Sequence, residues 1–208
     1  MTDTIETPRS PDGAPPATDK AARNRRLAIE WTVLIVAALV IAFLIKTFLF
    51  QAFYIPSESM VPTLKVGDRV LVNKLSYDLH DVHRGDIIVF KAPPAAEAGN
   101  IKDLVKRVVG LPGDTVEARD ENGEVCDTED VSKMCHVYVN NRRLDEPYIH
   151  GLTTVNLPPT KVPAGQLFMM GDNRTSSRDS RYFGSIGKSA VIGRVFVRIW
   201  PPGRIGLL

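Results

Sequence analysis

Hydrophobic and polar positions divide the 208 residues of the chain into three stretches. Residues 1–26 are polar and rich in Pro, Ala, Thr and Asp, and they hold too little apolar surface to form a core. Residues 27–50 are almost entirely apolar. In residues 51–208, short apolar segments alternate with turn signals. The pattern therefore predicts a flexible tail, one long helix and a β-rich domain.

The apolar stretch predicts a transmembrane helix within residues 27–50. Trp31–Ile45 carries no charge, and continuing the helix to Phe50 gives a length of about 30 Å, enough to cross a hydrocarbon core. Lys46, near the far end, can extend its amine to the lipid headgroups. A cleaved signal peptide would need a small-residue cleavage site, which the following FLFQAFYIP lacks. A buried core helix would show a polar face, and none is present.

A basic cluster precedes this helix and predicts the orientation of the chain in the membrane. Lys20, Arg23, Arg25 and Arg26 stand just before the span, and positive charges favour the cytoplasmic side. We therefore expect a single-pass protein of the plasma membrane with a cytoplasmic N-terminus. Residues 51–208 would lie on the extracytoplasmic side.

The fold class that we expect for residues 51–208 is mainly β, an antiparallel sheet or barrel-like fold. The stretch 117–161 is more polar and predicts a variable insertion or subdomain. Phe196–Leu208 is apolar, so it contacts lipid or forms a core strand, and we favour the strand. The predicted strands are Arg69–Leu75, Asp86–Lys91, Leu104–Val109, Thr115–Arg119, His136–Asn140, Leu167–Met170 and Val191–Trp200.

Composition excludes several classes of function. The chain has 26 basic and 24 acidic residues, which is not the charge of a nucleic-acid-binding protein. The four histidines show no HExxH spacing and there is no CxxC pair, so we expect no metal and no cofactor. Cys126 and Cys135 would form a short disulfide loop outside the cytoplasm or remain two free thiols. Arg84-Gly85-Asp86 is better explained as a turn before a strand than as an adhesion motif.

Three segments carry residues that could do chemistry, Ile55–Leu64, Leu104–Asp114 and Gly171–Gly184. A serine needs a base to remove its proton, and no histidine stands in a comparable motif. A lysine can serve if it is neutral, but with an ordinary pKa only about one in a thousand is uncharged at neutral pH. Burial lowers the pKa of a lysine. In a strand, Lys106 shares its face with the apolar Leu104 and Val108, which is suggestive of such an environment.

Together these segments resemble the type I signal peptidases, the bacterial enzymes that remove signal peptides from exported proteins. Pro56–Leu64 matches the family segment Pro-Ser-x-Ser-Met-x-Pro-Thr-Leu, and Lys106–Asp114 matches Lys-Arg-Val-Val-Gly-Leu-Pro-Gly-Asp. Gly171–Arg181 matches Gly-Asp-Asn-Arg-x-x-Ser-x-Asp-Ser-Arg. The similarity extends over most of residues 50–200 in the order of the family. Several motifs in one order make this resemblance specific.

The resemblance implies a role for each matching residue. Ser59 would be the nucleophile and Lys106 the general base that later protonates the leaving amine. Ser57 would join the Ser59 N–H in an oxyanion hole, and the hydroxyl of Ser177 would orient the lysine.

It also implies a structural ion pair and a substrate pocket. Asp172, Asp179 and Arg181 would brace the site. Shallow apolar pockets would accept the small side chains of an Ala-x-Ala signal. The residues expected to line them are Phe53, Ile55, Met60, Leu64, Leu104 and Val105.

The partners implied are preproteins that carry signal peptides, together with the lipid bilayer. Glu58 stands where the family often has glycine, and Leu104 where it often has tyrosine, which leaves the pocket shape open. Two other interpretations are a Ser/Lys self-cleaving repressor and a non-catalytic, membrane-tethered β domain. The first carries a DNA-binding domain where this chain has its span, and Ser59→Ala would leave the second unaffected. The oligomeric state stays open.

Overall fold

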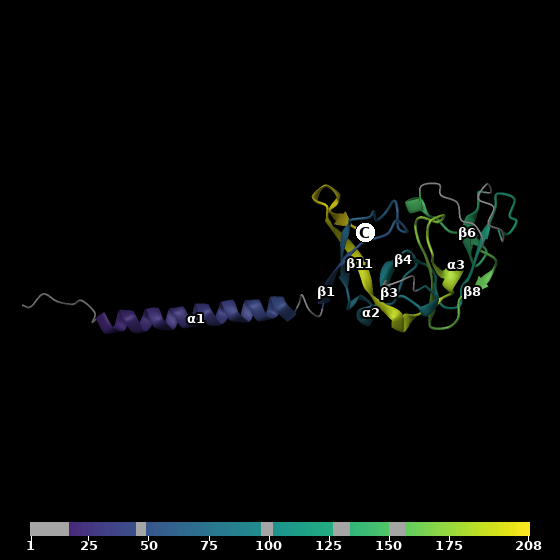
Figure 1. Ribbon diagram of the computed structural model, residues 1–208. Helices are drawn as coiled ribbons and strands as arrows, with labels where there is room; N and C mark the ends of the chain where they lie inside the picture. The colour runs from purple at the N-terminus through teal and green to yellow at the C-terminus, as the bar shows by residue number, and fades with distance from the viewer. Residues whose placement is uncertain (1–16, 45–48, 97–101, 127–133, 150–156) are drawn as a thin grey trace, which may run out of the picture. The chain divides into compact units, whose positions relative to one another are not determined.

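The computed structural model describes residues 17–44, 49–96, 102–126, 134–149 and 157–208. The chain divides into two units, residues 1–45 and residues 46–208. The first contains one helix, α1 (Ala17–Leu44), drawn in purple and blue in Figure 1. Its part Ala22–Phe43 is long and apolar enough to cross a membrane, and its side chains are exposed.

The limits of this helix differ from the prediction of a tail over 1–26 and a span over 27–50. The helix begins at Ala17, within the expected tail, and the described part ends at Leu44. Phe50 is instead the first residue of a strand and pairs with Asn73. The 22 residues of Ala22–Phe43 already rise about 33 Å as a helix, so Phe50 is not needed to complete a span. Lys46 and residues 1–16 lie outside the described residues.

The second unit is built on an antiparallel sheet with the order β1-β2-β11-β3-β4-β9-β10, and β12 pairs with β11. Two short helices, α2 (Ser76–Leu79) and α3 (Ser180–Phe183), flank its strands. This is the mainly antiparallel β class that we expected. The strands are β1 (Phe50–Tyr54), β2 (Arg69–Asn73), β3 (Ile87–Lys91), β4 (Asp103–Gly110), β9 (Gln166–Met170), β10 (Ile186–Gly187), β11 (Val191–Trp200) and β12 (Gly206–Leu207).

A smaller sheet with the order β7-β6-β5-β8 occupies nearly the stretch expected for an insertion or subdomain. Asn140 and Asn141 both have positive φ, the conformation of a two-residue hairpin turn, and they connect β6 to β7. Whether the stretch varies among relatives stays a prediction. Its strands are β5 (Thr115–Arg119), β6 (His136–Val139), β7 (Arg142–Arg143) and β8 (Thr160–Lys161).

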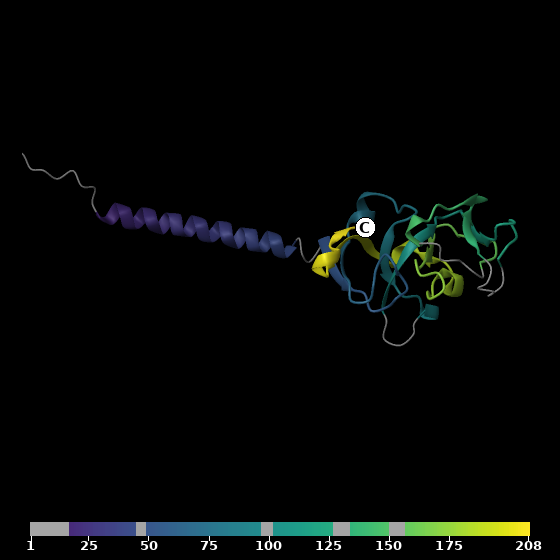
Figure 2. The same ribbon diagram turned by 90° about the horizontal axis from the view of Figure 1, so that it is seen from above.

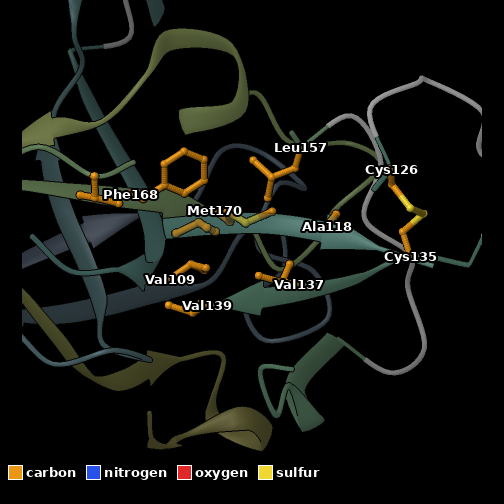
Figure 3. Packing of buried hydrophobic residues seen from close by; sticks show 11 residues of the cluster. Val109, Ala118, Cys126, Cys135, Val137, Val139, Leu157, Phe168 and Met170 are labelled. Atoms are coloured by element: carbon orange, nitrogen blue, oxygen red, sulfur yellow. A yellow bond between two sulfur atoms is a disulfide. The ribbon is translucent and has the colours of Figure 1, made fainter. Parts of the chain in front are cut away.

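The two sheets share one hydrophobic core, shown in Figure 3. Val109 and Met170 come from the main sheet, and Ala118 and Val137 from the small sheet. Cys126 and Cys135 lie at the end of this cluster and form a disulfide, the first of the two alternatives considered for them. The small sheet therefore packs on the main one without a separate core.

The predicted strand segments all contain strands. The C-terminal segment also forms strands, as favoured, but none of its residues is buried, so it is not the core strand that was expected. Within Phe196–Leu208, β11 pairs with β2 and β12, and these last strands are yellow in Figures 1 and 2. Trp200, Ile205 and Leu207 are nevertheless exposed. The pattern missed β1, because FQAFY continues the apolar run of the anchor. It missed β7, β8, β10 and β12, because two residues are too short to show alternation.

Candidate active site

Ser59 and Lys106 are brought into direct contact by two separate elements of the second unit. Ser59 lies in the loop between β1 and β2, and Lys106 lies in β4. The Lys106 Nζ donates a hydrogen bond of 2.6 Å to the Ser59 Oγ. Lys106 is only 3% exposed, while Ser59 is partly accessible. The Ser57 Oγ lies 3.3 Å from the Ser59 Oγ, so both hydroxyls meet at one place.

The environment of Lys106 favours the neutral amine. Burial lowers the pKa of Lys106 to about 8, because the ammonium loses its hydration. The charges of Asp179 and Asp172 oppose this shift, and Arg181 supports it. At pH 7 a pKa of about 8 leaves about a tenth of the lysines uncharged, against less than a thousandth for an ordinary lysine. Such an amine can accept the proton of a hydroxyl with which it shares a hydrogen bond.

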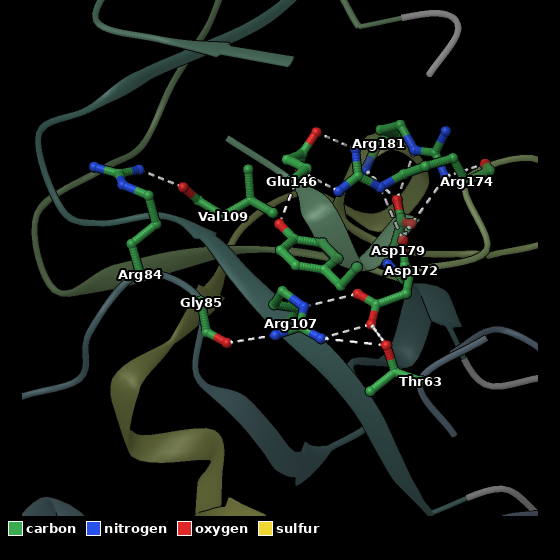
Figure 4. A network of polar contacts seen from close by, with 12 residues as sticks. Thr63, Arg84, Gly85, Arg107, Val109, Glu146, Asp172, Arg174, Asp179 and Arg181 are labelled. Atoms are coloured by element: carbon green, nitrogen blue, oxygen red, sulfur yellow. Dashed lines mark hydrogen bonds and ion pairs between the residues drawn. The ribbon is translucent and has the colours of Figure 1, made fainter. Parts of the chain in front are cut away.

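The carboxylate of Asp172 is bound by a residue that the sequence analysis did not single out. Arg107 donates two hydrogen bonds to it, from Nε at 2.8 Å and from Nη2 at 2.7 Å. Thr63 Oγ1 donates a third, at 2.6 Å. Figure 4 shows these three side chains together. Arg107 follows Lys106 directly on β4, and this adjacency is the signal that could have revealed it.

The carboxylate of Asp179 is held separately, so the expected brace consists of two ion pairs. Arg181 Nε and Nη2 donate to Asp179 at 2.8 and 2.9 Å, and Gly171 N donates to the same carboxylate at 3.0 Å. Asp179 also caps helix α3 by accepting from Arg181 N. Arg181 further donates to the carbonyls of Arg174 and Ser177. These bonds fix the loop after β9.

A second pair of contacts joins this loop and β4 to the segment that follows β7 of the small sheet. Arg174 is fully buried and forms an ion pair with Glu146. Tyr148 donates a hydrogen bond to Glu146, and its ring stacks on the guanidinium of Arg107 at 3.8 Å. Glu146 and Tyr148 were also missed, because their chain segment shows no motif of its own.

Ser177 is near the dyad but does not form the contact expected of it. Its Oγ is buried and has no hydrogen-bond partner among the described residues. A Cβ at position 171 would collide with Ser177 Oγ and with the carbonyl of Ser59, so only glycine fits there. Ser177 thus lies beside the backbone of the nucleophile, and its role in orienting Lys106 stays a prediction.

An apolar cavity opens beside the two serines and the lysine. Phe53, Ile55, Met60, Leu104 and Val105 line it, as expected. Leu64 does not line it, although it is buried in the same core cluster as Ile55 and Met60, and binding of substrate by these residues stays a prediction. No group of three or more His, Cys, Asp or Glu side chains suited to a metal occurs within the ranges that the structure describes.

The antiparallel scaffold and the serine–lysine contact together define a candidate serine hydrolase. Comparisons with known proteins agree with a hydrolase. The profile of the family described as "Signal peptidase, peptidase S26" matches residues 28–200. "Probable signal peptidase I-2" of a Synechocystis species is 43% identical over 83% of this chain and 73% of its own length. "Signal peptidase I" of Leptolyngbya laminosa is 38% identical over 97% of this chain and 93% of its own length.

"Signal peptidase IB" of Staphylococcus aureus is 34% identical over 83% of this chain and 90% of its own length. A crystal structure of a signal peptidase I from Enterococcus faecalis aligns with 55% of this chain and 97% of its own, at 31% identity and a TM-score of 0.41. The chain belongs to the signal peptidase family, peptidase S26, and it is a hydrolase of the signal peptidase I type.

Proposed function

We propose that this protein removes N-terminal signal peptides from exported preproteins with Ser59 as nucleophile and Lys106 as general base. The observation that supports this most directly is the 2.6 Å hydrogen bond between the Ser59 hydroxyl and a buried lysine. Membership of the signal peptidase family supplies the substrate class.

In the proposed reaction, the neutral amine of Lys106 takes the proton of Ser59 as the Ser59 Oγ attacks the scissile carbonyl carbon. The resulting oxyanion accepts hydrogen bonds from the Ser59 N–H and the Ser57 hydroxyl. The C–N bond then breaks, and the Lys106 ammonium gives its proton to the leaving amine. A water molecule, deprotonated by the same amine, hydrolyses the acyl-enzyme ester and restores both groups.

The cavity supports a preference for small side chains before the cut, as in Ala-x-Ala. Its walls are apolar, and large side chains such as Phe53 and Met60 line it together with Ser59. Leu104 contributes an aliphatic wall where a family member often has an aromatic one. We expect alanine to be accepted and a bulky residue to be excluded by contact with these walls.

We also propose that α1 anchors the protein in the plasma membrane with its N-terminus in the cytoplasm. Arg23, Arg25 and Arg26 are exposed at the start of the apolar helix, as positive charges on the cytoplasmic side would be. Fifteen residues separate Phe43, the last residue of the apolar helix, from Ser59, a reach of at most about 55 Å. A preprotein whose own apolar helix is still in the bilayer would present its cleavage site at that level.

Cleavage of an Ala-x-Ala preprotein by the full chain in detergent tests the proposal. Wild type should cut, whereas Ser59→Ala and Lys106→Ala should each lose at least about 10³-fold in kcat. Ser189→Ala and Lys188→Ala, two exposed positions in one turn, are matched controls and should cut as wild type does. Undiminished cleavage by either dyad variant overturns the mechanism.

A further inference from the structure

The loop after β9 binds the nucleophile segment through one residue, Asn173. Its backbone N–H donates to the carbonyl of Ser59 at 3.1 Å. Its side-chain Nδ2 donates to the carbonyl of Glu58 at 3.2 Å. Asn173 therefore forms hydrogen bonds with two consecutive backbone carbonyls, those of Glu58 and Ser59. Ser59 carries the proposed nucleophile.

The Glu58 carbonyl also accepts a hydrogen bond of 3.0 Å from the Val61 N–H, so Asn173 and this turn together fix the peptide that precedes Ser59. The peptide bond between Glu58 and Ser59 is trans, because the cis bonds of the described chain precede Pro62 and Pro201. In a planar trans peptide the C=O and N–H point in opposite directions. Holding the Glu58 carbonyl toward Asn173 therefore turns the Ser59 N–H away from Asn173.

That N–H is available for a ligand. No acceptor within the described residues bonds it, whereas the carbonyls on both sides of Ser59 are bonded. Ser57 and Ser59 both line the cavity, and their hydroxyl oxygens lie 3.3 Å apart. An unbonded backbone donor beside a hydroxyl in an accessible cavity is the arrangement that stabilises an oxyanion.

Asn173 is itself held firmly enough to act in this way. Its neighbour Arg174 donates to the Gly171 carbonyl at 3.0 Å and is ion-paired with Glu146. Arg181 donates to the Arg174 carbonyl at 2.7 Å. The Thr175 hydroxyl makes a long contact of 3.4 Å with the Asn173 Oδ1, which leaves the NH₂ end of the amide toward Glu58.

We propose that Asn173 is a positioning residue that aims the Ser59 N–H at the oxygen of the scissile carbonyl. The inference rests on the proposed function, since it assigns a support to the oxyanion hole of that same reaction. Asn173 touches neither substrate nor Lys106 in this account. Its side chain acts through the peptide between Glu58 and Ser59, while the backbone bonds of Asn173 and Val61 stay in place in the variants, so the effect of the side chain belongs to the transition state.

The test measures kcat and KM separately for the full chain in detergent, with an Ala-x-Ala preprotein. Asn173→Ala removes one neutral donor and should lower kcat about tenfold. Asn173→Asp places a carboxylate against the Glu58 carbonyl, which disturbs the peptide, and should lower kcat about 10²-fold. KM should stay within about twofold in both, because the lost interaction forms in the transition state. Asn122→Asp, an exposed turn position, controls for the added charge.

Two further readouts separate positioning from a general structural role. The double variant Asn173→Ala/Ser57→Ala should lose less than the product of the two single losses, because both act on one oxyanion. The pH at which activity is half-maximal should not move, since Lys106 is untouched. If Asn173→Asp fails to fold, the kcat of Asn173→Ala decides whether the inference holds.

Wild-type kcat in a folded Asn173→Asp, or a loss expressed only in KM or in a shifted pH midpoint, overturns the inference. The Ser59→Ala variant, assayed in the same experiment, distinguishes failure of this inference from failure of the proposed function. If Ser59→Ala is inactive and the Asn173 variants cut as wild type does, this inference alone fails. If Ser59→Ala still cuts, the proposed function fails as well.

Discussion

Lys106 and Arg107 are neighbouring buried residues on the two faces of strand β4, and they have different kinds of partner. Arg107 is held by the Asp172 carboxylate, by the Gly85 carbonyl at 2.8 Å and by the ring of Tyr148. Within the part of the chain that the structure describes, Lys106 shares one hydrogen bond, with the neutral hydroxyl of Ser59. Both residues are less than 10% exposed. The difference lies in the partners: a carboxylate compensates the buried charge of Arg107, whereas a neutral hydroxyl contacts the amine of Lys106, whose pKa is lowered by burial.

The same difference suits Arg107 to a structural role and Lys106 to the proposed chemical role. A buried ion pair with all its hydrogen bonds resists change, since removing one partner leaves an uncompensated charge. A buried lysine without a carboxylate in direct contact lies close to losing its proton, and that is what a general base requires. The loop after β9 serves both, because Asp172 pairs with Arg107 while Asn173 binds the backbone of Ser59.

The largest expected effect on activity comes from replacing Lys106 with arginine, the residue type at the neighbouring position 107. Lys106→Arg keeps the positive charge but replaces an amine that can lose its proton with a guanidinium that cannot. Activity on an Ala-x-Ala preprotein should fall about 10³–10⁴-fold, as for loss of a general base. Lys188→Arg, an exposed position, should have no effect. A Lys106→Arg variant with a tenth or more of wild-type kcat would refute the proposed role of the amine.

Replacing Arg107 with an uncharged residue should mainly lower the free energy of unfolding. Arg107→Met leaves the carboxylate of Asp172, which is 0% exposed, without its cation. Unfolding of residues 46–208 in denaturant should require about 3–5 kcal/mol less free energy than in wild type. Arg142→Met, an exposed position on β7, is the matched control. A loss below about 1 kcal/mol would mean that Asp172 finds other partners or water.

Lys106→Met should abolish cleavage and yet stabilise the folded protein near neutral pH. A pKa lowered from 10.5 to about 8 corresponds to a cost of about 3 kcal/mol at pH 7, of which the lost Ser59 hydrogen bond offsets about 1 kcal/mol. Between pH 8 and 10.5 the unfolded wild type binds more protons than the folded one, so its stability rises with pH. The advantage of the variant, measured by denaturation, should therefore shrink over that window. A constant difference would place an ordinary lysine at this position.

The smallest expected effect is the pH dependence of the wild-type enzyme itself. With a pKa of about 8 for Lys106, the neutral fraction rises from about a tenth at pH 7 to nearly all at pH 9. The kcat/KM for a preprotein should rise nearly tenfold over this range and level off above it. An initial-rate profile at constant ionic strength measures this. A profile without a rise between pH 7 and 9 would contradict the proposed base.

Much of this organisation could be predicted from the sequence, and the exceptions have physical causes. β2 alternates between buried and less buried positions, and β3 and β4 are short apolar runs between turn signals, both of which are local properties of the chain. The candidate dyad was found through motif resemblance. Arg107, Glu146 and Tyr148 were missed because their contacts join positions far apart in the chain. Leu64 does not line the cavity beside Ser59, and the sequence could not show this because an apolar residue can line a cavity or fill a core.

The sequence by itself determined an apolar helix, a β-rich second unit and the three segments that carry the candidate chemistry, because periodicity, turn residues and motif order are local. The tertiary structure alone decided that Ser59 and Lys106, 47 positions apart, lie within hydrogen-bonding distance. It also decided that the lysine is buried with a lowered pKa while its neighbour is fully paired. Solvation and pairing depend on what the rest of the chain places around a side chain, and a linear pattern does not contain that information.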